Sequence, residues 1–148
     1  MKVIIITGTP GTGKSTYGKK LAKEKGYRYF DINALVKEKK LHEGYDRSKR
    51  SYDIDIKKLK SFLLHIIQEE KGKKSKGIVL DSHLSHYLPP AHVDLCIVMK
   101  CDLKKLKKRL EKRGYLKSKV RENLDCEIFD VCLNEAKEKG HKIRLIQS

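Results

Sequence analysis

An eight-residue segment near the start of the chain has the residue types and spacing of a loop that binds phosphate groups. Residues 8–15 are Gly-Thr-Pro-Gly-Thr-Gly-Lys-Ser, directly after the apolar run at residues 3–6. Glycines allow backbone N–H groups to turn inward around phosphate oxygens, and a helix that begins at the lysine offers its positive N-terminal end to the same charge. A buried strand before the motif and a helix after it form the context in which this pattern binds phosphates.

Two side chains of this motif have separate chemical tasks. Lys14 can reach the β- and γ-phosphates of a nucleotide, and the Ser15 hydroxyl can bind the Mg²⁺ ion between them. The alternative is a Gly-rich turn that binds nothing. The position, the spacing and the flanking elements together favour the phosphate site.

A carboxylate follows the buried strand predicted at residues 77–80. Asp81 then stands at the carboxyl end of that strand, where parallel α/β sheets collect their ligands, and it can hold Mg²⁺ through water. His83 is near enough in sequence to orient water or a phosphate. The simpler alternatives are a capping or solvated aspartate and an ordinary loop histidine. His83 and His86 have the spacing of a metal pair, but no third ligand stands near them, so we expect no zinc site.

Two arginines mark a third candidate group. Arg109 and Arg113 share one helix face, next to Gly114. Phosphoryl transfer spreads negative charge over the equatorial oxygens, and the planar guanidinium group neutralises that charge in a bidentate manner. In a chain whose cations are mostly lysines, arginine at both positions suggests a catalytic role. The alternative is a pair of surface cations.

Alternating strands and helices position these groups. Apolar runs and helical stripes predict strands at residues 2–7, 27–30, 77–81, 93–99 and 143–146, and helices at 14–25, 33–40, about 55–70, 103–113 and 118–139. Asp53 or Asp55 can cap the third helix, and residues 41–52 form a polar, turn-rich segment. The pattern predicts an α/β protein with a parallel five-stranded sheet flanked by helices.

Composition limits the remaining possibilities. The 148 residues make one domain, and the absence of a long apolar run or leader pattern leads us to expect a soluble, cytoplasmic protein, and a monomer because no exposed apolar stripe is evident. The four cysteines lack ligand spacing, so we expect reduced core residues. The formal net charge of +16 indicates either a lysine-rich surface of thermophile type or attraction to polyanions such as RNA.

Four segments in order along the chain resemble the adenylate kinase isoenzyme 6 family, a small group from archaea and eukaryotic nuclei. The segments are residues 8–16, Asp81-Ser82-His83, residues 109–115 with Arg-Gly-Tyr, and residues 122–129 with Cys-Glu-Ile-Phe. The last two are far more specific than the phosphate loop. Residues 29–46 also match the region of that family that binds nucleoside monophosphates.

The resemblance implies a nucleoside monophosphate kinase fold with a short lid and the reaction Mg·ATP + AMP ⇌ 2 ADP. It also implies that residues of about 31–54 bind the monophosphate, that about 112–122 form the lid, and that Asp81 and His83 lie near magnesium and the reacting group. The ATP-binding residues that it implies are Gly11, Gly13, Lys14, Ser15, Thr16 and Arg113.

The sequence departs from the family pattern at two points, and two other functions are compatible with its motifs. Lys37 stands where classical adenylate kinases have an arginine for the monophosphate, and the chain stops just after its last strand, where relatives usually carry another helix. The resemblance also allows an ATPase that acts in assembly of the small ribosomal subunit and contacts ribosomal protein or RNA. A kinase for another small hydroxyl acceptor shares the phosphate loop but would not predict the Arg-Gly-Tyr and Cys-Glu-Ile-Phe runs.

Overall fold

Five parallel strands form the centre of the protein. The structure, a computed structural model, describes residues 1–38, 42–46 and 51–148. The strand order is β2-β5-β1-β6-β7, and every pairing in this sheet is parallel, which confirms the predicted five-stranded parallel sheet. The strands are β1 (Lys2–Thr7), β2 (Arg28–Asp31), β5 (Gly77–Asp81), β6 (Leu95–Lys100) and β7 (Ile143–Gln147). The helices are α1 (Lys14–Lys25), α2 (Ile32–Glu38), α3 (Ile56–Gly72), α4 (Leu103–Lys112), α5 (Lys117–Ile128) and α6 (Val131–Glu138).

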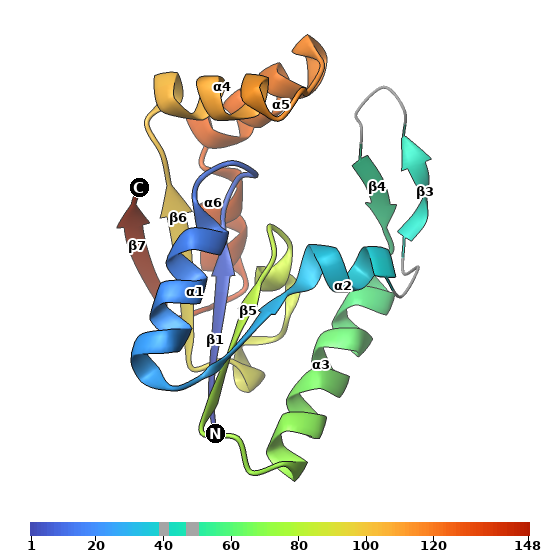
Figure 1. Cartoon of the computed structure of the whole chain (residues 1–148), viewed down its shortest axis with the longest axis vertical. Coiled ribbons are helices and arrows are strands. Elements are labelled where there is room, and N and C mark those ends of the chain that lie inside the picture. Colours follow the sequence, from blue (N-terminus) through green and yellow to red (C-terminus); the bar gives the residue numbers. More distant parts are fainter. Residues whose placement is uncertain (39–41, 47–50) are drawn as a thin grey trace.

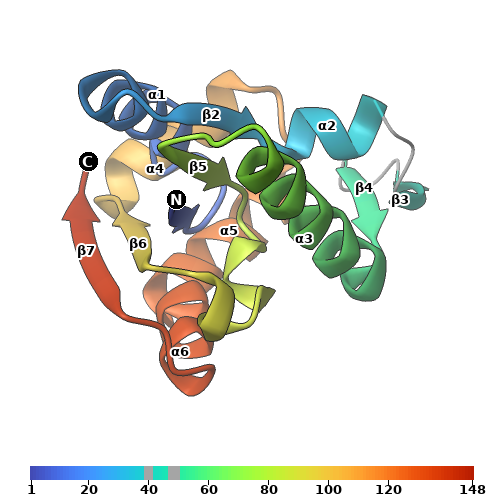
Figure 2. The same cartoon turned by 90° about the horizontal axis from the view of Figure 1, so that it is seen from below.

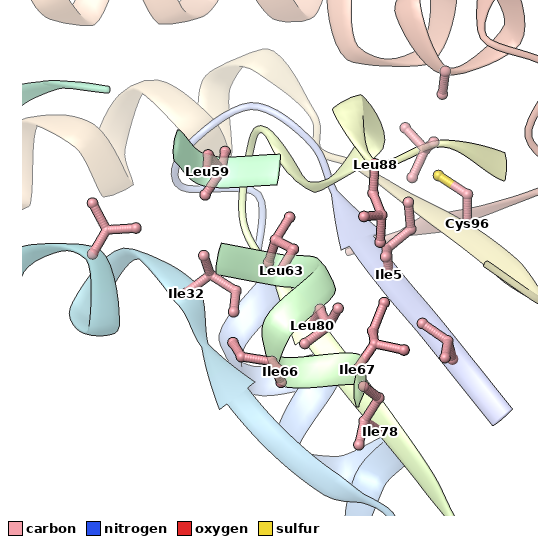
Figure 3. Packing of buried hydrophobic residues seen from close by; sticks show 14 of the residues in the cluster. Ile5, Ile32, Leu59, Leu63, Ile66, Ile67, Ile78, Leu80, Leu88 and Cys96 are labelled. Carbon is pink, nitrogen blue, oxygen red and sulfur yellow. The ribbon is translucent and has the colours of Figure 1, made fainter. Parts of the chain in front are cut away.

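Helices cover both faces of this sheet. Successive residues of a strand point to opposite faces, so Val3 and Ile5 pack with residues of α2, α3 and α6, whereas Ile4 and Ile6 pack with residues of α1. Figure 2 shows α1 on one side of the strands and α3 and α6 on the other. The larger cluster fills the space between the sheet and α3 (Figure 3). This three-layer arrangement is the one that the alternating pattern predicts.

The pair α4 and α5 stands above the carboxyl ends of the strands (Figure 1). Asp102 caps α4 by accepting a hydrogen bond from the backbone of Lys105 at 3.2 Å, and Gly114 turns the chain with a φ of 78°. Leu106, Leu110 and Val120 form a separate apolar cluster between the two helices. Because this cluster is distinct from the main core, α4 and α5 make a small unit of their own above the sheet.

Part of the segment at residues 41–52, which was expected to be turn-rich, forms two paired strands. Strands β3 (His42–Asp46) and β4 (Ser51–Ile54) pair antiparallel, while Leu41 and residues 47–50 of that prediction lie outside the described residues. The strands were not predicted because the segment is polar, although tyrosine, found at the paired positions 45 and 52, favours β structure. Asp55 is the cap of α3, since its carboxylate accepts from the backbone of Lys57 and Lys58.

The prediction of one long helix over residues 118–139 is wrong. The chain breaks between α5 and α6, where Asp130 takes a left-handed conformation with a φ of 51°. The Asp130 carboxylate pairs with Lys100 at the end of β6. The break falls on an aspartate, a residue type that tolerates this conformation and favours helix N-caps, and the ion pair holds the turn against the end of β6.

Apolar side chains are also more exposed than the sequence suggests. Phe129 is 68% and Ile128 is 47% exposed at the turn between α5 and α6. These two adjacent side chains add exposed apolar surface at one turn, and the expected monomer stays a prediction. The four cysteines are free, with Cys96 and Cys101 buried. Among the described residues, no helix is both long and apolar enough to span a bilayer.

Gly77 at the start of β5 offers a test of the packing. A Cβ atom at this position would lie 2.6 Å from the ring of Tyr27. We expect Gly77→Ala to lower the free energy of unfolding by about 1–3 kcal/mol, because the ring must move out of a filled space. Thermal unfolding measures the change. Gly72→Ala is the matched control, since no atom lies within 4 Å of its added Cβ, and equal stability of the two variants would contradict this packing.

Candidate active site

The loop between β1 and α1 requires glycine at its sharp bends. Gly8, Gly11 and Gly13 have φ values of 144°, 93° and 93°, a region that residues with a Cβ atom rarely adopt. A Cβ atom on Gly8 would also lie 2.7 Å from the backbone oxygen of Met99. Gly13 is the N-cap of α1, and no side chain caps that helix end. The N–H groups of the first turn therefore remain available for an anion.

Lys14 folds back over this loop. Its Nζ atom donates to the backbone oxygens of Gly8 and Thr9 at 3.0 and 3.2 Å. Burial lowers the pKa of Lys14 to about 8, and the charge of Asp81 opposes that shift. The ammonium group is thus held mainly by neutral carbonyls, and a phosphate that replaced them would be a stronger partner.

This shift predicts that ATP binding takes up a proton. Above pH 8 the free protein holds Lys14 largely neutral, whereas bound phosphates stabilise its charged form, so affinity for ATP falls up to about tenfold per pH unit above that point. Calorimetry at pH 8.5 in buffers of different ionisation enthalpy measures the uptake. Lys14→Met should abolish it and Lys23→Met, an exposed position on the same helix, should not. Equal uptake by both variants would rule out Lys14 as its source.

Ser15 and Asp81 lie together at the carboxyl edge of the sheet. The Ser15 Oγ atom is 3.4 Å from Asp81 Oδ2, because Asp81 pairs in register with Ile6 on the neighbouring strand β1. The Tyr29 hydroxyl donates to the same carboxylate oxygen. Burial raises the pKa of Asp81, while the hydrogen bond from Tyr29 and the charge of Lys14 act in the opposite direction. A hydroxyl and a carboxylate at this separation are oxygen ligands of the kind that Mg²⁺ prefers, so these residues fit the ion.

His83 follows Asp81 by two residues and is half-buried. Burial, reinforced by the charge of Lys14, lowers the pKa of His83 to about 3, so the imidazole is neutral at physiological pH. Its Nδ1 atom is buried and has no hydrogen-bond partner among the described residues. A neutral ring with a free nitrogen can orient water or a phosphate oxygen, as the sequence predicts, but cannot supply positive charge.

The two arginines differ in their surroundings. Arg109 donates to the backbone oxygen of Gly11 at 3.1 Å and to the Ser148 hydroxyl at 3.2 Å, so it supports the phosphate loop from α4. Arg113 is the exposed C-cap of α4, and its charge is among the causes that lower the pKa of Lys14. Only Arg113 is therefore exposed to solvent and able to swing toward a bound nucleotide.

A cleft of about 640 Å³ lies against the phosphate loop, α1 and α4. Its lining includes five residues expected to bind ATP or to act in catalysis, together with the C-terminal segment: Gly11, Gly13, Thr16, Arg109, Arg113 and Ser148. Lys14, Ser15 and Asp81 are not part of this lining, although Lys14 and Ser15 stand between two residues that are. The predicted residues thus fall into two groups, one that lines the cleft and one at the carboxyl edge of the sheet.

Sequence reasoning missed two residues of this region. Tyr29 comes from β2, and only the sheet order brings its hydroxyl to Asp81. Glu127 is almost fully buried and contacts the phosphate loop. A signal for Glu127 was present, because it continues the buried stripe of Val120 and Asn123 on α5, and a carboxylate on such a stripe needs a partner.

Comparison with known proteins agrees with this geometry. A family model described as an AAA domain matches residues 4–130. The sequence is 46% identical over 140 residues to a putative adenylate kinase of Methanocaldococcus jannaschii, a match that covers 95% of this chain and 75% of that protein. It is 36% identical to the adenylate kinase isoenzyme 6 homolog of Caenorhabditis elegans, covering 91% of this chain and 72% of that protein. The chain belongs to the adenylate kinase isoenzyme 6 family.

Membership of the adenylate kinase isoenzyme 6 family makes the chain a phosphotransferase with a P-loop kinase fold. The fold is similar to that of a deoxyadenosine kinase from M. mycoides solved with bound dATP, with a TM-score of 0.54 and 17% identity over 99% of this chain and 90% of that one. At that identity the likeness concerns the fold alone. The family predicted from the Arg-Gly-Tyr and Cys-Glu-Ile-Phe segments is confirmed.

Proposed function

We propose that this protein is a nucleoside monophosphate kinase that transfers the γ-phosphoryl group of ATP to AMP, giving two ADP. The observation that carries the proposal is the convergence of Lys14, Ser15 and Asp81 beside the phosphate loop, next to a cleft that residues of the same loop line. The names of the relatives in the family, putative adenylate kinase and adenylate kinase isoenzyme 6 homolog, support the choice of acceptor.

In this proposal ATP is the donor and lies along the phosphate loop. The loop N–H groups and Lys14 bind its β- and γ-phosphates, and the cleft lined by Thr16 and Arg113 takes the remainder of the nucleotide. Ser15 would bind Mg²⁺ directly and Asp81 through water, and the ion would neutralise phosphate charge. The neutral His83 ring would orient a water molecule or a phosphate oxygen near Ser15 and Asp81.

The binding site for AMP would be formed by the segment of about residues 31–54. Lys37 on α2 is a candidate for binding the AMP phosphate. A phosphate oxygen of AMP attacks the γ-phosphorus of ATP, and the bond from that phosphorus to the β–γ bridging oxygen breaks. AMP thereby becomes ADP, and the remainder of ATP is the second ADP. Residues of about 112–122, which comprise the α4–α5 junction and the first half of α5, would close as a short lid. Closure excludes water, so that AMP rather than water accepts the group.

The test is ATP turnover measured with and without AMP, CMP or dAMP. We expect turnover to increase at least about 100-fold with AMP, with ADP as the sole product, because positioning of the acceptor supplies much of the catalysis. Hydrolysis that no acceptor changes would disprove the kinase proposal.

A second candidate function is an ATPase that works in ribosome assembly. The lysines of α4 favour it: Lys104, Lys105, Lys107, Lys108 and Lys112 are all exposed, in a chain of net charge +16. Such a surface attracts polyanions such as ribosomal RNA. This function predicts hydrolysis that ribosomal RNA or ribosomal protein changes and AMP does not. We further propose a cytoplasmic monomer for either role, which sedimentation and fractionation would test.

A further inference from the structure

Glu127 is a buried carboxylate that joins three separate parts of the site. Its side chain, on the last turn of α5, is 4% exposed. The Oε1 atom accepts a hydrogen bond from the Thr9 hydroxyl at 3.0 Å, and the Oε2 atom accepts from the backbone N–H of Cys101 at 2.7 Å. The contact with Thr9 spans 118 positions of sequence, from the phosphate loop to the helix that follows the lid.

Lys100 supplies the opposite charge. Its Nζ atom lies 3.0 Å from Glu127 Oε1, donates to the Glu127 backbone oxygen at 3.1 Å, and pairs with Asp130. Three oxygens of the α5–α6 turn therefore hold one ammonium group at the end of β6. The result is a fixed joint between the α5–α6 turn and the sheet, at the position where the helix breaks.

Thr9 connects Glu127 to Lys14 through hydrogen bonds of its side chain and its backbone. The Thr9 side chain is held by Glu127, and its backbone oxygen accepts from Lys14 Nζ at 3.2 Å and from the Thr12 hydroxyl at 2.7 Å. Thr9 is 2% exposed, so water cannot replace the carboxylate as its partner. The orientation of one peptide unit in the loop therefore depends on a residue of α5.

The same helix carries part of the lid. Val120 of α5 packs with Leu106 and Leu110 of α4, and α4 supplies Arg109 to the loop oxygen of Gly11. Two contacts thus tie the phosphate loop to the helix pair, one through Arg109 and one through Glu127. Both helices are therefore linked to the loop through buried or half-buried polar side chains.

We propose that Glu127 is a positioning residue for nucleotide binding: through Thr9 it holds the phosphate loop in register with the α4–α5 pair and so keeps the loop N–H groups and Lys14 in place. Glu127 touches no phosphate in this role. The inference rests on the part of the proposed function that assigns ATP to the loop, and it is independent of the acceptor.

Thr9→Val and Glu127→Met test the link, with direct binding of Mg·ADP and Mg·ATP as the readout. Thr9→Val keeps the shape of the side chain and removes the donor, so we expect its dissociation constants to rise about 10-fold, as befits loss of a hydrogen bond to a buried charge. Glu127→Met keeps the length of the side chain and removes both acceptor oxygens, so it should raise the dissociation constants at least as much. Because both changes break the bond between Thr9 and Glu127, the double variant should bind about as weakly as Glu127→Met alone.

Two controls separate positioning from stability. Thr9→Ser keeps the hydroxyl and should retain near wild-type affinity. Asp125→Asn removes a carboxylate from the same helix, at an exposed ion pair with Arg121, and should leave binding unchanged. If Thr9→Val lowers the melting temperature yet binds nucleotide normally, or if the two losses add in full, the proposal is wrong. If the variants bind nucleotide as expected but AMP does not change ATP turnover, only the kinase proposal is disproved.

Discussion

We expect Lys14→Ala to lower the rate of phosphoryl transfer by about 10³-fold while leaving the fold intact, since removal of one preorganised charge stabiliser has effects of this order. The Lys14 ammonium is the cation that the structure holds directly over the loop, and burial makes its interaction with phosphate stronger than in water. Steady-state formation of ADP measures the loss. Arginine at this position should not restore the rate, because its larger planar group does not fit a site built for a compact ammonium.

The matched control is Lys23→Ala on the same helix. Lys23 is exposed, so its replacement should change neither the rate nor the melting temperature by much. Circular dichroism of both variants shows whether the helix remains. Turnover close to that of the wild type in a folded Lys14→Ala variant would remove the phosphate loop from the mechanism.

The local features of the site could be predicted from sequence because each depends on a short segment. The glycines of residues 8–13 are needed for backbone angles set within the loop itself, and Asp81 follows from the end of one apolar strand. Asp55 and Asp102 cap helices through bonds to residues two and three positions away. In each case neighbours in sequence supply the physical cause.

The missed features depend on partners far away in the chain. Tyr29 reaches Asp81 because β2 pairs with β5 at the edge of the sheet, and no local pattern gives that order. The turn at Asp130 is held against Lys100 of another strand, and this pairing is not visible in the local sequence. The contact of Glu127 with Thr9 is of the same kind. Distant partners decide these positions, so they become visible only in the fold.

Asp81→Asn should have opposite effects on activity and on stability. Asparagine keeps the size of the side chain and an oxygen that can accept from Tyr29, but it loses the charge that favours Mg²⁺. We expect activity at limiting Mg²⁺ to fall about 100-fold, within the range found when a group that orients metal-bound water is changed. A Mg²⁺ titration of turnover measures it, and saturating Mg²⁺ should restore part of the rate.

The stability of the Asp81→Asn variant should be equal to that of the wild type or higher. Burial raises the pKa of Asp81, so its ionised form is less favourable in the folded protein than in the unfolded chain, and at neutral pH the charge lowers the free energy of unfolding. Removing the charge should therefore leave the melting temperature equal or higher. Glu24→Gln, an exposed change of the same charge on α1, should alter neither property. If Asp81→Asn lost stability and kept its Mg²⁺ response, Asp81 would serve the fold; a more stable but less active variant means that the chain retains a destabilising charge at this position because phosphoryl transfer needs it.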